Sequence, residues 1–179
     1  VYSPCSWKDI GGICMNKLEG FPTVFYVTLE EDIERQNLLT SAFKEYNITP
    51  IPLKSKKFTE TNDVIIGKHI DSLTGPTRGC ITSHIKAINQ WYSTTKESYG
   101  FFCEDDLSLE TIQYWNFTWK EVRKRLPINF DTCQFTIINP NGITLKLHHR
   151  FINDFSAACY LITRHHAEKI FKLHNRGSC

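Results

Sequence analysis

The sequence has 179 residues, which suits one domain long enough to bury an apolar core. Basic residues exceed acidic residues by only two (21 against 19), which argues against the strongly basic surface of a nucleic-acid-binding domain. No apolar run approaches the roughly 18 residues of a membrane-spanning helix, and the first residues lack the pattern of a signal peptide. The chain begins with Val1 rather than Met, as an excised piece of a longer protein would.

Seven cysteines are spread along the chain without a Cys-x-x-Cys pair, so a zinc site of the usual spacing is not expected. Cys5 and Cys14 lie in a loop-like start and would pair in an oxidising compartment. Four others lie inside apolar segments, where a free thiol behaves as a small hydrophobic group: Cys80, Cys103, Cys133 and Cys159. This distribution favours a reducing, cytoplasmic location, with the lumen of the endoplasmic reticulum as the alternative.

The first half of the chain has the pattern of a strand, a helix and a second strand. Residues 1–22 show no clear period and predict an irregular leader. Residues 23–29 form a continuous β-branched and aromatic run, typical of a strand buried on both faces of a parallel sheet. A second, short strand is predicted over residues 49–53, and this order is the unit of a parallel α/β sheet.

The helix between these strands is predicted to begin at about Glu30 and to end at about Tyr46. Thr28 and Glu31 have the spacing of a capping box at its start. Its apolar stripe is formed by Leu38, Ala42 and Tyr46, with Leu39 and Phe43 beside them.

The middle of the chain predicts a loop, a helix and a strand. Residues 54–78 are mostly polar, with a weak strand or turn near residues 64–66. Helical spacing then returns at Ile81, Ile85, Ile88 and Tyr92. Residues 99–103 predict another buried strand, which stops at an acidic triplet.

The last third predicts one long helix, further strands and a closing helix. Ser108 is the expected N-cap of the long helix, which ends at Pro127. Its stripe consists of Ile112, Trp115, Trp119, Val122 and Leu126, and the two tryptophans are expected in the core. Strands are predicted over residues 133–138, 143–147 and 157–162, with turn residues at 139–142. Thr163 is the expected cap of the closing helix, which runs to about His174.

Three adjacent carboxylates, Glu104, Asp105 and Asp106, stand at the carboxyl end of a predicted buried strand. Ligands of open α/β sheets bind beyond this end of the strands. Hard oxygen ligands favour Mg²⁺ or Mn²⁺, so a metal-binding and phosphate-binding centre is one interpretation. If extended geometry continues, Glu104 and Asp106 share one face and Asp105 is opposed. A solvated acidic turn near a helix N-terminus is the other interpretation.

Four stretches, in order, resemble glycosyltransferase family 25, which contains bacterial lipooligosaccharide glycosyltransferases and procollagen galactosyltransferases. They are residues 24–29 with Arg35 beyond them, Gly79-Cys80-Ile81-Thr82-Ser83-His84, Phe101-Phe102-Cys103-Glu104-Asp105-Asp106, and residues 158–163. The second stretch is similar to the family's Gly-Cys-x-x-Ser-His motif, and the third to its Glu-Asp-Asp form of the Asp-x-Asp signature. Thr28 stands where the family usually has Asn. The resemblance spans about residues 24–173.

This resemblance implies a GT-A-type, Rossmann-like fold over residues 23–179, with a mainly parallel central sheet flanked by helices. It implies a metal-dependent inverting hexosyltransferase that uses Mn²⁺ or Mg²⁺. The donor would be a UDP-sugar, and the acceptor a hydroxyl of a glycan or of a hydroxylysine-type protein side chain. Nucleic acid is not an expected partner.

The resemblance also assigns roles to individual residues. Glu104 and Asp106 would hold the metal, with His148 or His149 as an additional late ligand, while Asp105 would contact the ribose or the sugar. The other expected donor-binding residues are Thr28, Leu29, Glu30, Arg35, Arg78, Gly79 and Ser83. Asp154 is the candidate general base that an inverting transfer needs at the acceptor hydroxyl.

Some of these residues, and the function itself, have a second interpretation. Arg35 fits a nucleotide contact and a surface pair with Glu31 equally well. His84 lies beside a buried helix face and is expected as a core histidine or a support for another ligand rather than as a base. Asp154 also fits a simple turn residue. A non-catalytic glycosyltransferase-like binding domain and a magnesium-dependent phosphoesterase are the alternative functions.

Overall fold

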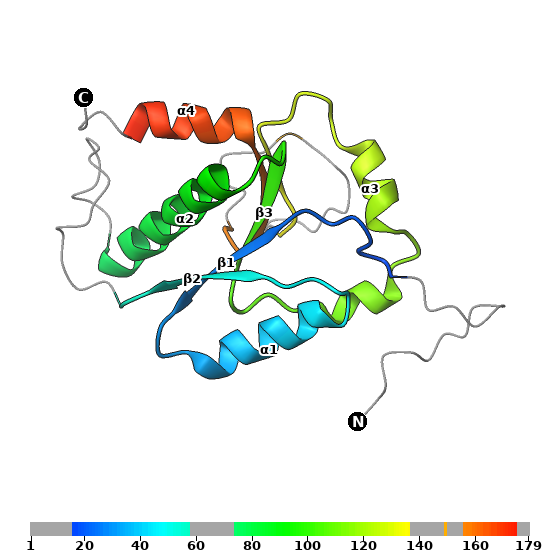
Figure 1. The fold of residues 1–179 in the computed structure, drawn as a ribbon, viewed down its shortest axis with the longest axis horizontal. Coiled ribbons are helices and arrows are strands. Elements are labelled where there is room, and N and C mark those ends of the chain that lie inside the picture. Colours follow the sequence, from blue (N-terminus) through cyan, green and yellow to red (C-terminus); the bar gives the residue numbers. More distant parts are fainter. Residues whose placement is uncertain (1–15, 58–73, 137–148, 150–155, 175–179) are drawn as a thin grey trace.

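A five-stranded mixed sheet with helices on both faces forms the centre of the chain (Figure 1). The computed structural model describes residues 16–57, 74–136, 149 and 156–174. The elements of this part are β1 (Val24–Leu29), α1 (Ile33–Lys44), β2 (Ile51–Ser55), α2 (Gly75–Thr94), β3 (Tyr99–Glu104), the 3-10 helix η2 (Glu110–Tyr114), α3 (Trp119–Arg125), β4 (Thr132–Gln134), β5 (Cys159–Thr163) and α4 (Arg164–His174). The fold is therefore α/β, as the sequence predicts.

The strand order is β2-β1-β3-β5-β4. β1 pairs in parallel with both β2 and β3, whereas β5 is antiparallel to β3 and to β4. The sheet is thus mixed, because one strand runs against the other four. The parallel half of the sheet has its strands where the sequence predicts them, with β2 two residues later than expected.

Two apolar clusters cover the two faces of the sheet. Alternate residues of β1, Val24 and Tyr26, belong to a cluster with side chains of α1, η2 and α3. Phe25 and Val27 belong to the other cluster, with side chains of α2 and α4. Figure 1 shows the same division, with α2 and α4 on one side of the strands and α1 and α3 on the other.

The chain reverses direction across the sheet at β1. It moves from β1 through α1 to β2 on one side, and then returns through α2, past β1, to β3. Right-handed crossovers in opposite directions place their helices on opposite faces, which is where α1 and α2 lie. Helices that diverge in this way leave a crevice at the carboxyl ends of the strands.

The predicted start of α1 is wrong. The helix begins at Ile33, and its N-cap residue, Asp32, makes no side-chain capping hydrogen bond. The expected capping box of Thr28 and Glu31 does not form, because Thr28 is the fifth residue of β1 and its hydroxyl donates to Asp105 instead. The Thr28 hydroxyl, which the local pattern assigned to a helix cap, is thus used in a hydrogen bond to a residue distant in sequence.

The buried faces of α1 and α2 are rotated from the predicted stripes. On α1, Leu39 and Phe43 are buried, whereas Leu38 is 65% exposed. On α2, Ile81 is 40% exposed, and the buried residues are Thr82, His84, Ala87, Ile88 and Trp91. Polar residues therefore occupy part of the buried face of α2, which explains why the aliphatic pattern alone placed that face incorrectly.

The single long helix predicted after Ser108 is also wrong. Its span is divided into η2 and α3, which are separated by residues 115–118. Thr118 and Glu121 form a capping box that starts α3, and Lys17 Nζ donates to the carbonyl oxygens of Gln113 and Trp115 at the break. A new N-cap and an outside donor for the freed carbonyls stabilise two short helices over one long helix. The prediction that Trp119 is buried is confirmed, and α3 ends at Arg125, before Pro127.

The last strand and helix agree with their predictions. β5 lies within one or two residues of the expected span, and the hydroxyl of Thr163 accepts from His166 N at the start of α4. Of the strand expected over residues 133–138, residues 133 and 134 belong to β4, residues 135 and 136 are not in a strand, and residues 137 and 138 lie outside the described residues. The predicted strand or turn at residues 64–66, the turn at 139–142 and the strand at 143–147 lie outside the described residues.

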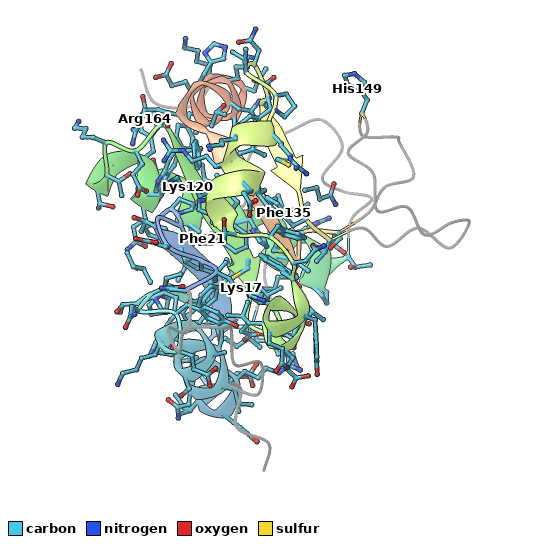
Figure 2. All side chains as sticks on the ribbon, turned by 90° about the vertical axis from the view of Figure 1, so that its right-hand side faces the viewer. Lys17, Phe21, Lys120, Phe135, His149 and Arg164 are labelled. Atoms are coloured by element: carbon cyan, nitrogen blue, oxygen red, sulfur yellow. The ribbon has the colours of Figure 1, made fainter. Side chains whose placement is uncertain are left out.

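Residues 16–22, the described part of the expected leader, pack against the domain (Figure 2). Leu18 is 2% exposed, and the ring of Phe21 lies 4.9 Å from that of Phe101 and 4.7 Å from that of Trp119. This segment therefore covers the face of the sheet that α3 also covers. None of the helices described here is long and apolar enough to cross a membrane.

Arg164 fixes the end of α2 to the start of α4. Its guanidinium donates to the carbonyl oxygens of Tyr92, Thr95 and Glu97, all at distances of 2.8–3.0 Å. The same group lies 4.9 Å from the ring centroid of Trp91. These contacts hold the C-terminal end of α2 against the start of α4.

Gly100 provides a test of the packing between β3 and α2. A Cβ atom added at this residue would lie 2.7 Å from two ring atoms of Trp91. We expect Gly100→Ala to lower the free energy of unfolding by about 1–3 kcal/mol, as overpacking of a core does. Chemical denaturation measures this value.

The control is the same substitution in a Trp91→Leu background, because the leucine side chain ends at Cδ and has no atoms in the place of the indole Nε1 and Cε2. Gly100→Ala should lower the free energy of unfolding by less in that background than in the unsubstituted chain. In a double-mutant cycle this difference is a favourable coupling energy between the two substitutions. An equal cost in both backgrounds would contradict this packing.

Candidate functional site

A cleft of about 760 Å³ opens at the carboxyl ends of β1, β2 and β3, which is within the size range of small-molecule sites. It is the crevice that the divergence of α1 and α2 predicts. Its walls come from the end of β1 and the start of α1, from the end of β2 and residues 56–57, from α2, and from the end of β3. The cleft is lined by Val27, Thr28, Leu29, Glu30, Asp32, Arg35, Leu53, Lys54, Ser55, Lys56, Lys57, Pro76, Gly79, Cys80, Thr82, Ser83, Lys86, Glu104 and Asp105.

Asp105 is the most firmly held carboxylate of the cleft. The Thr28 hydroxyl donates to its Oδ2 at 2.6 Å, and Arg35 Nη1 donates to its Oδ1 at 3.3 Å. The side chain of Asp105 is only 10% exposed. The hydrogen bond to Asp105 raises the pKa of Arg35. The sequence left two partners open for Arg35, and in the structure its ion pair is with Asp105.

Backbone contacts define the shape of the cleft beside Asp105. Gln36 Nε2 donates to the carbonyl oxygen of Leu29 at 2.8 Å, and Glu30 N donates to that of Ser55 at 2.9 Å. Ser55 Oγ lies 2.9 Å from Ser83 Oγ, which joins the end of β2 to α2. These contacts tie the ends of β1 and β2 to the two flanking helices.

The acidic triplet does not keep the alternation of an extended strand. β3 ends at Glu104, and a turn follows in which Leu107 N donates to the carbonyl oxygen of Glu104. As a result Glu104 and Asp105, rather than Glu104 and Asp106, both line the cleft. Asp106 is exposed on the turn, close enough to Arg35 for its charge to contribute to the raised pKa of that residue.

Glu104 faces two residues of α2. Its Oε1 lies 3.7 Å from His84 Nε2 and 3.7 Å from Cys80 Sγ. The imidazole of His84 lowers the pKa of Glu104, and the thiol of Cys80 adds to this effect. Burial raises the pKa of Cys80 to about 11, and the negative charge of Glu104 acts in the same direction. On its other side, His84 Nδ1 lies 2.9 Å from the hydroxyl of Tyr160.

Most of the residues that the sequence assigned to the donor are in this cleft. Thr28, Leu29, Glu30, Arg35, Gly79, Ser83 and Asp105 all line it. Arg78 is partly buried on α2 but is not among the lining residues. His149 is exposed and lies apart from the helices and strands (Figure 2). His148 and Asp154 lie outside the described residues.

Sequence reasoning missed the lysines of the cleft. Lys54, Lys56 and Lys57 at and after the end of β2 and Lys86 on α2 bring positive charge to the walls of the cleft. The run Lys54-Ser55-Lys56-Lys57 directly after a predicted strand was the available signal. With Arg35, five basic side chains line the cleft against four acidic ones, which suits a ligand with several negative charges.

The sequence analysis also did not place Cys80 at the site, because it expected Cys80 as a buried apolar group. Cys103, Cys133 and Cys159 are buried as expected, but Cys80 is only partly buried and faces the cleft. The sequence feature that could have predicted this cluster is the i, i+4 spacing of Cys80 and His84, which places both side chains on one face of a helix.

Comparison with known proteins does not assign a family, because no family model and no curated protein matches the chain. The chemistry of the cleft therefore rests on its own residues.

The reactivity of Cys80 tests the electrostatics of the cleft. The thiolate is the nucleophile, so a pKa of about 11 predicts slow alkylation by iodoacetamide at neutral pH and a rate that rises up to about pH 11. Glu104→Gln removes the negative charge beside the thiol and should lower this pKa, although burial still keeps it raised.

Peptide mass spectrometry of the metal-free chain at a series of pH values measures the rate at Cys80. Asp131→Asn, at an exposed carboxylate paired with Lys169, is the matched control and should leave the profile unchanged. A profile with an ordinary thiol pKa in the unsubstituted chain would show that this account of Cys80 is wrong.

Proposed function

We propose that this chain is a metal-dependent glycosyltransferase domain of the GT-A type, which binds a nucleoside diphosphate sugar in the cleft and transfers its hexose. One observation carries the proposal: a cleft at the reversal of the strand order, with a largely shielded, anchored carboxylate and several basic side chains on its walls. Sites of this kind in α/β sheets accept nucleotides. The four sequence stretches that resemble glycosyltransferase family 25 give the reaction class and favour a UDP-sugar.

Asp105 is suited to accept hydrogen bonds from a ribose or sugar. The bonds from Thr28 and Arg35 fix its carboxylate in one orientation, and each carboxylate oxygen retains further acceptor capacity. A fixed acceptor loses little conformational entropy when a hydroxyl binds. The lysines at the end of β2 and on α2, which line the same cleft, would neutralise the charge of the diphosphate.

Glu104 and Asp106 are the proposed ligands of Mn²⁺ or Mg²⁺. They flank Asp105 at the end of β3, and carboxylate oxygens are the donors that these hard cations prefer. Asp106 is exposed, so its carboxylate is open to solvent and would be accessible to a cation. The metal, when bound, stabilises the negative charge that develops on the departing diphosphate.

The transfer is a single displacement with inversion. The acceptor hydroxyl oxygen forms a bond to the anomeric carbon while the bond from that carbon to the diphosphate oxygen breaks, and the electron pair leaves with the diphosphate. A base removes the acceptor proton. Asp154, which lies outside the described residues, remains the proposed base.

Calorimetric titration of UDP and of GDP, with and without Mn²⁺, tests the proposal. We expect UDP to bind in a manganese-dependent manner. Asp106→Ala should weaken the manganese-dependent binding by about 10-fold or more, since it removes a charged ligand. Glu110→Ala, at an exposed carboxylate of η2 that is not part of the cleft, should bind as the unsubstituted chain does.

The outcomes separate the glycosyltransferase from the two alternative functions, a non-catalytic binding domain and a phosphoesterase. Binding followed by hydrolysis of a UDP-hexose supports a transferase, and binding without turnover supports a binding domain. Absence of binding for both nucleotides with every metal contradicts the proposal, and hydrolysis of a simple phosphate ester in that case supports a phosphoesterase.

A further inference from the structure

Cys80, His84 and Glu104 form a cluster that the proposed transfer does not use as a unit. Cys80 and His84 lie one turn apart on α2, and Glu104 is the last residue of β3. One sulfur, one nitrogen and one oxygen atom of these residues lie within 4.8 Å of one another. We propose that these three residues bind a divalent transition-metal ion, Zn²⁺, with an open fourth position toward the cleft.

The distances from Glu104 Oε1 to the other two atoms are close to those of a zinc site. With the usual Zn–S, Zn–N and Zn–O bond lengths and tetrahedral angles, the sulfur and oxygen would be about 3.5 Å apart and the nitrogen and oxygen about 3.3 Å apart. The observed distances are both 3.7 Å. Shifts of a few tenths of an ångström would therefore bring both atoms to a zinc ion bound by Glu104. Cys80 Sγ and His84 Nε2, which lie within 4.8 Å of each other, would stand about 3.5 Å apart around the same ion.

The buried imidazole of His84 is an independent observation that points to a ligand. His84 is 6% exposed, and its Nε2 has no hydrogen-bond partner among the described residues. A buried polar atom without a partner costs free energy, and this atom is aimed at Glu104. A metal ion between Nε2, the thiolate and the carboxylate would remove that cost.

Tyr160 supplies the support that a metal-bound histidine usually has. Its hydroxyl lies 2.9 Å from His84 Nδ1, on the side of the ring away from the cluster. Metal binding at Nε2 requires the ring proton on Nδ1, from which it donates to the phenol oxygen. Such a bond orients the ring and keeps Nε2 available to the metal.

The donor set selects a softer ion than the one proposed for the diphosphate. A thiolate and an imidazole favour zinc, whereas Mn²⁺ and Mg²⁺ prefer oxygen. Cys80 and Glu104 line the cleft, so the fourth position faces it and is open to water or to a ligand oxygen. Binding forms the S–Zn bond and releases the thiol proton of Cys80 to solvent.

The zinc site does not depend on the proposed transferase. It requires no nucleotide, and it shares only Glu104 with the proposed manganese ligands. Variants of Glu104 therefore cannot separate the two sites, whereas variants of Cys80 and Asp106 can. Asp106→Ala should retain zinc and weaken manganese-dependent UDP binding.

Cobalt and zinc titrations of the metal-free chain test the site. We expect one equivalent of Co²⁺ to give a thiolate-to-cobalt charge-transfer band, which Zn²⁺ abolishes by displacement. Cys80→Ser should remove this band and weaken zinc binding more than about 10-fold, while Cys133→Ser, at a buried thiol on β4, should change neither. Tyr160→Phe should keep the band and weaken zinc binding about 10-fold or more.

A measurement on the unsubstituted chain avoids any effect of the substitutions on folding. Zn²⁺ should protect Cys80 from alkylation, as mapped by peptide mass spectrometry. Persistence of the charge-transfer band in Cys80→Ser, or alkylation of Cys80 at the same rate with and without Zn²⁺, would overturn the proposal. Absence of UDP binding by the unsubstituted chain would contradict the transferase and leave the zinc result unaffected.

Discussion

The parallel pairing of β1 with β3 is the constraint on which the candidate site depends. The register sets Val27 opposite Glu104, so the next residues, Thr28 and Asp105, emerge side by side at the end of the sheet. A hydrogen bond of 2.6 Å joins these two side chains at the ends of the strands, and the ion pair of Arg35 with Asp105 connects them to α1. A slip of one residue would turn every side chain of the strand to the other face and remove the contact. The cleft is therefore a consequence of sheet register as much as of the residues that line it.

Much of the fold could be predicted from local patterns. The apolar strand runs of β1, β3 and β5 are continuous, as in strands buried on both faces, and each was placed within two residues. The acidic triplet was also placed correctly at a strand end, because an apolar run that stops abruptly at charges defines that boundary. Helices were less predictable, since the stripes of α1 and α2 include buried polar residues such as Gln36 and His84.

Two of the errors share one physical origin, which is competition from contacts distant in sequence. Thr28 matched a helix cap, but Asp105 takes its hydroxyl. Cys80 matched a core position, but the exposure of α2 at the end of β3 places it in the cleft beside Glu104. The strand alternation expected for Glu104 and Asp106 failed because the chain turns directly after Glu104. Periodicity predicts which residues share one face of a helix or strand. The order of the strands in the sheet determines which other element packs against that face.

Hydrogen exchange with and without UDP and Mn²⁺ tests most directly whether the cleft at the ends of β1, β2 and β3 is where this chain binds its ligand. The account predicts slower exchange of backbone amides in residues 28–35, 54–57 and 79–86 and at the end of β3 around Asp105, because these segments line the cleft or lie directly beside its lining residues. It predicts no change in α3 or β4, which lie away from the cleft. Protection confined to α3 and β4, or no protection at any peptide under saturating ligand, would contradict it.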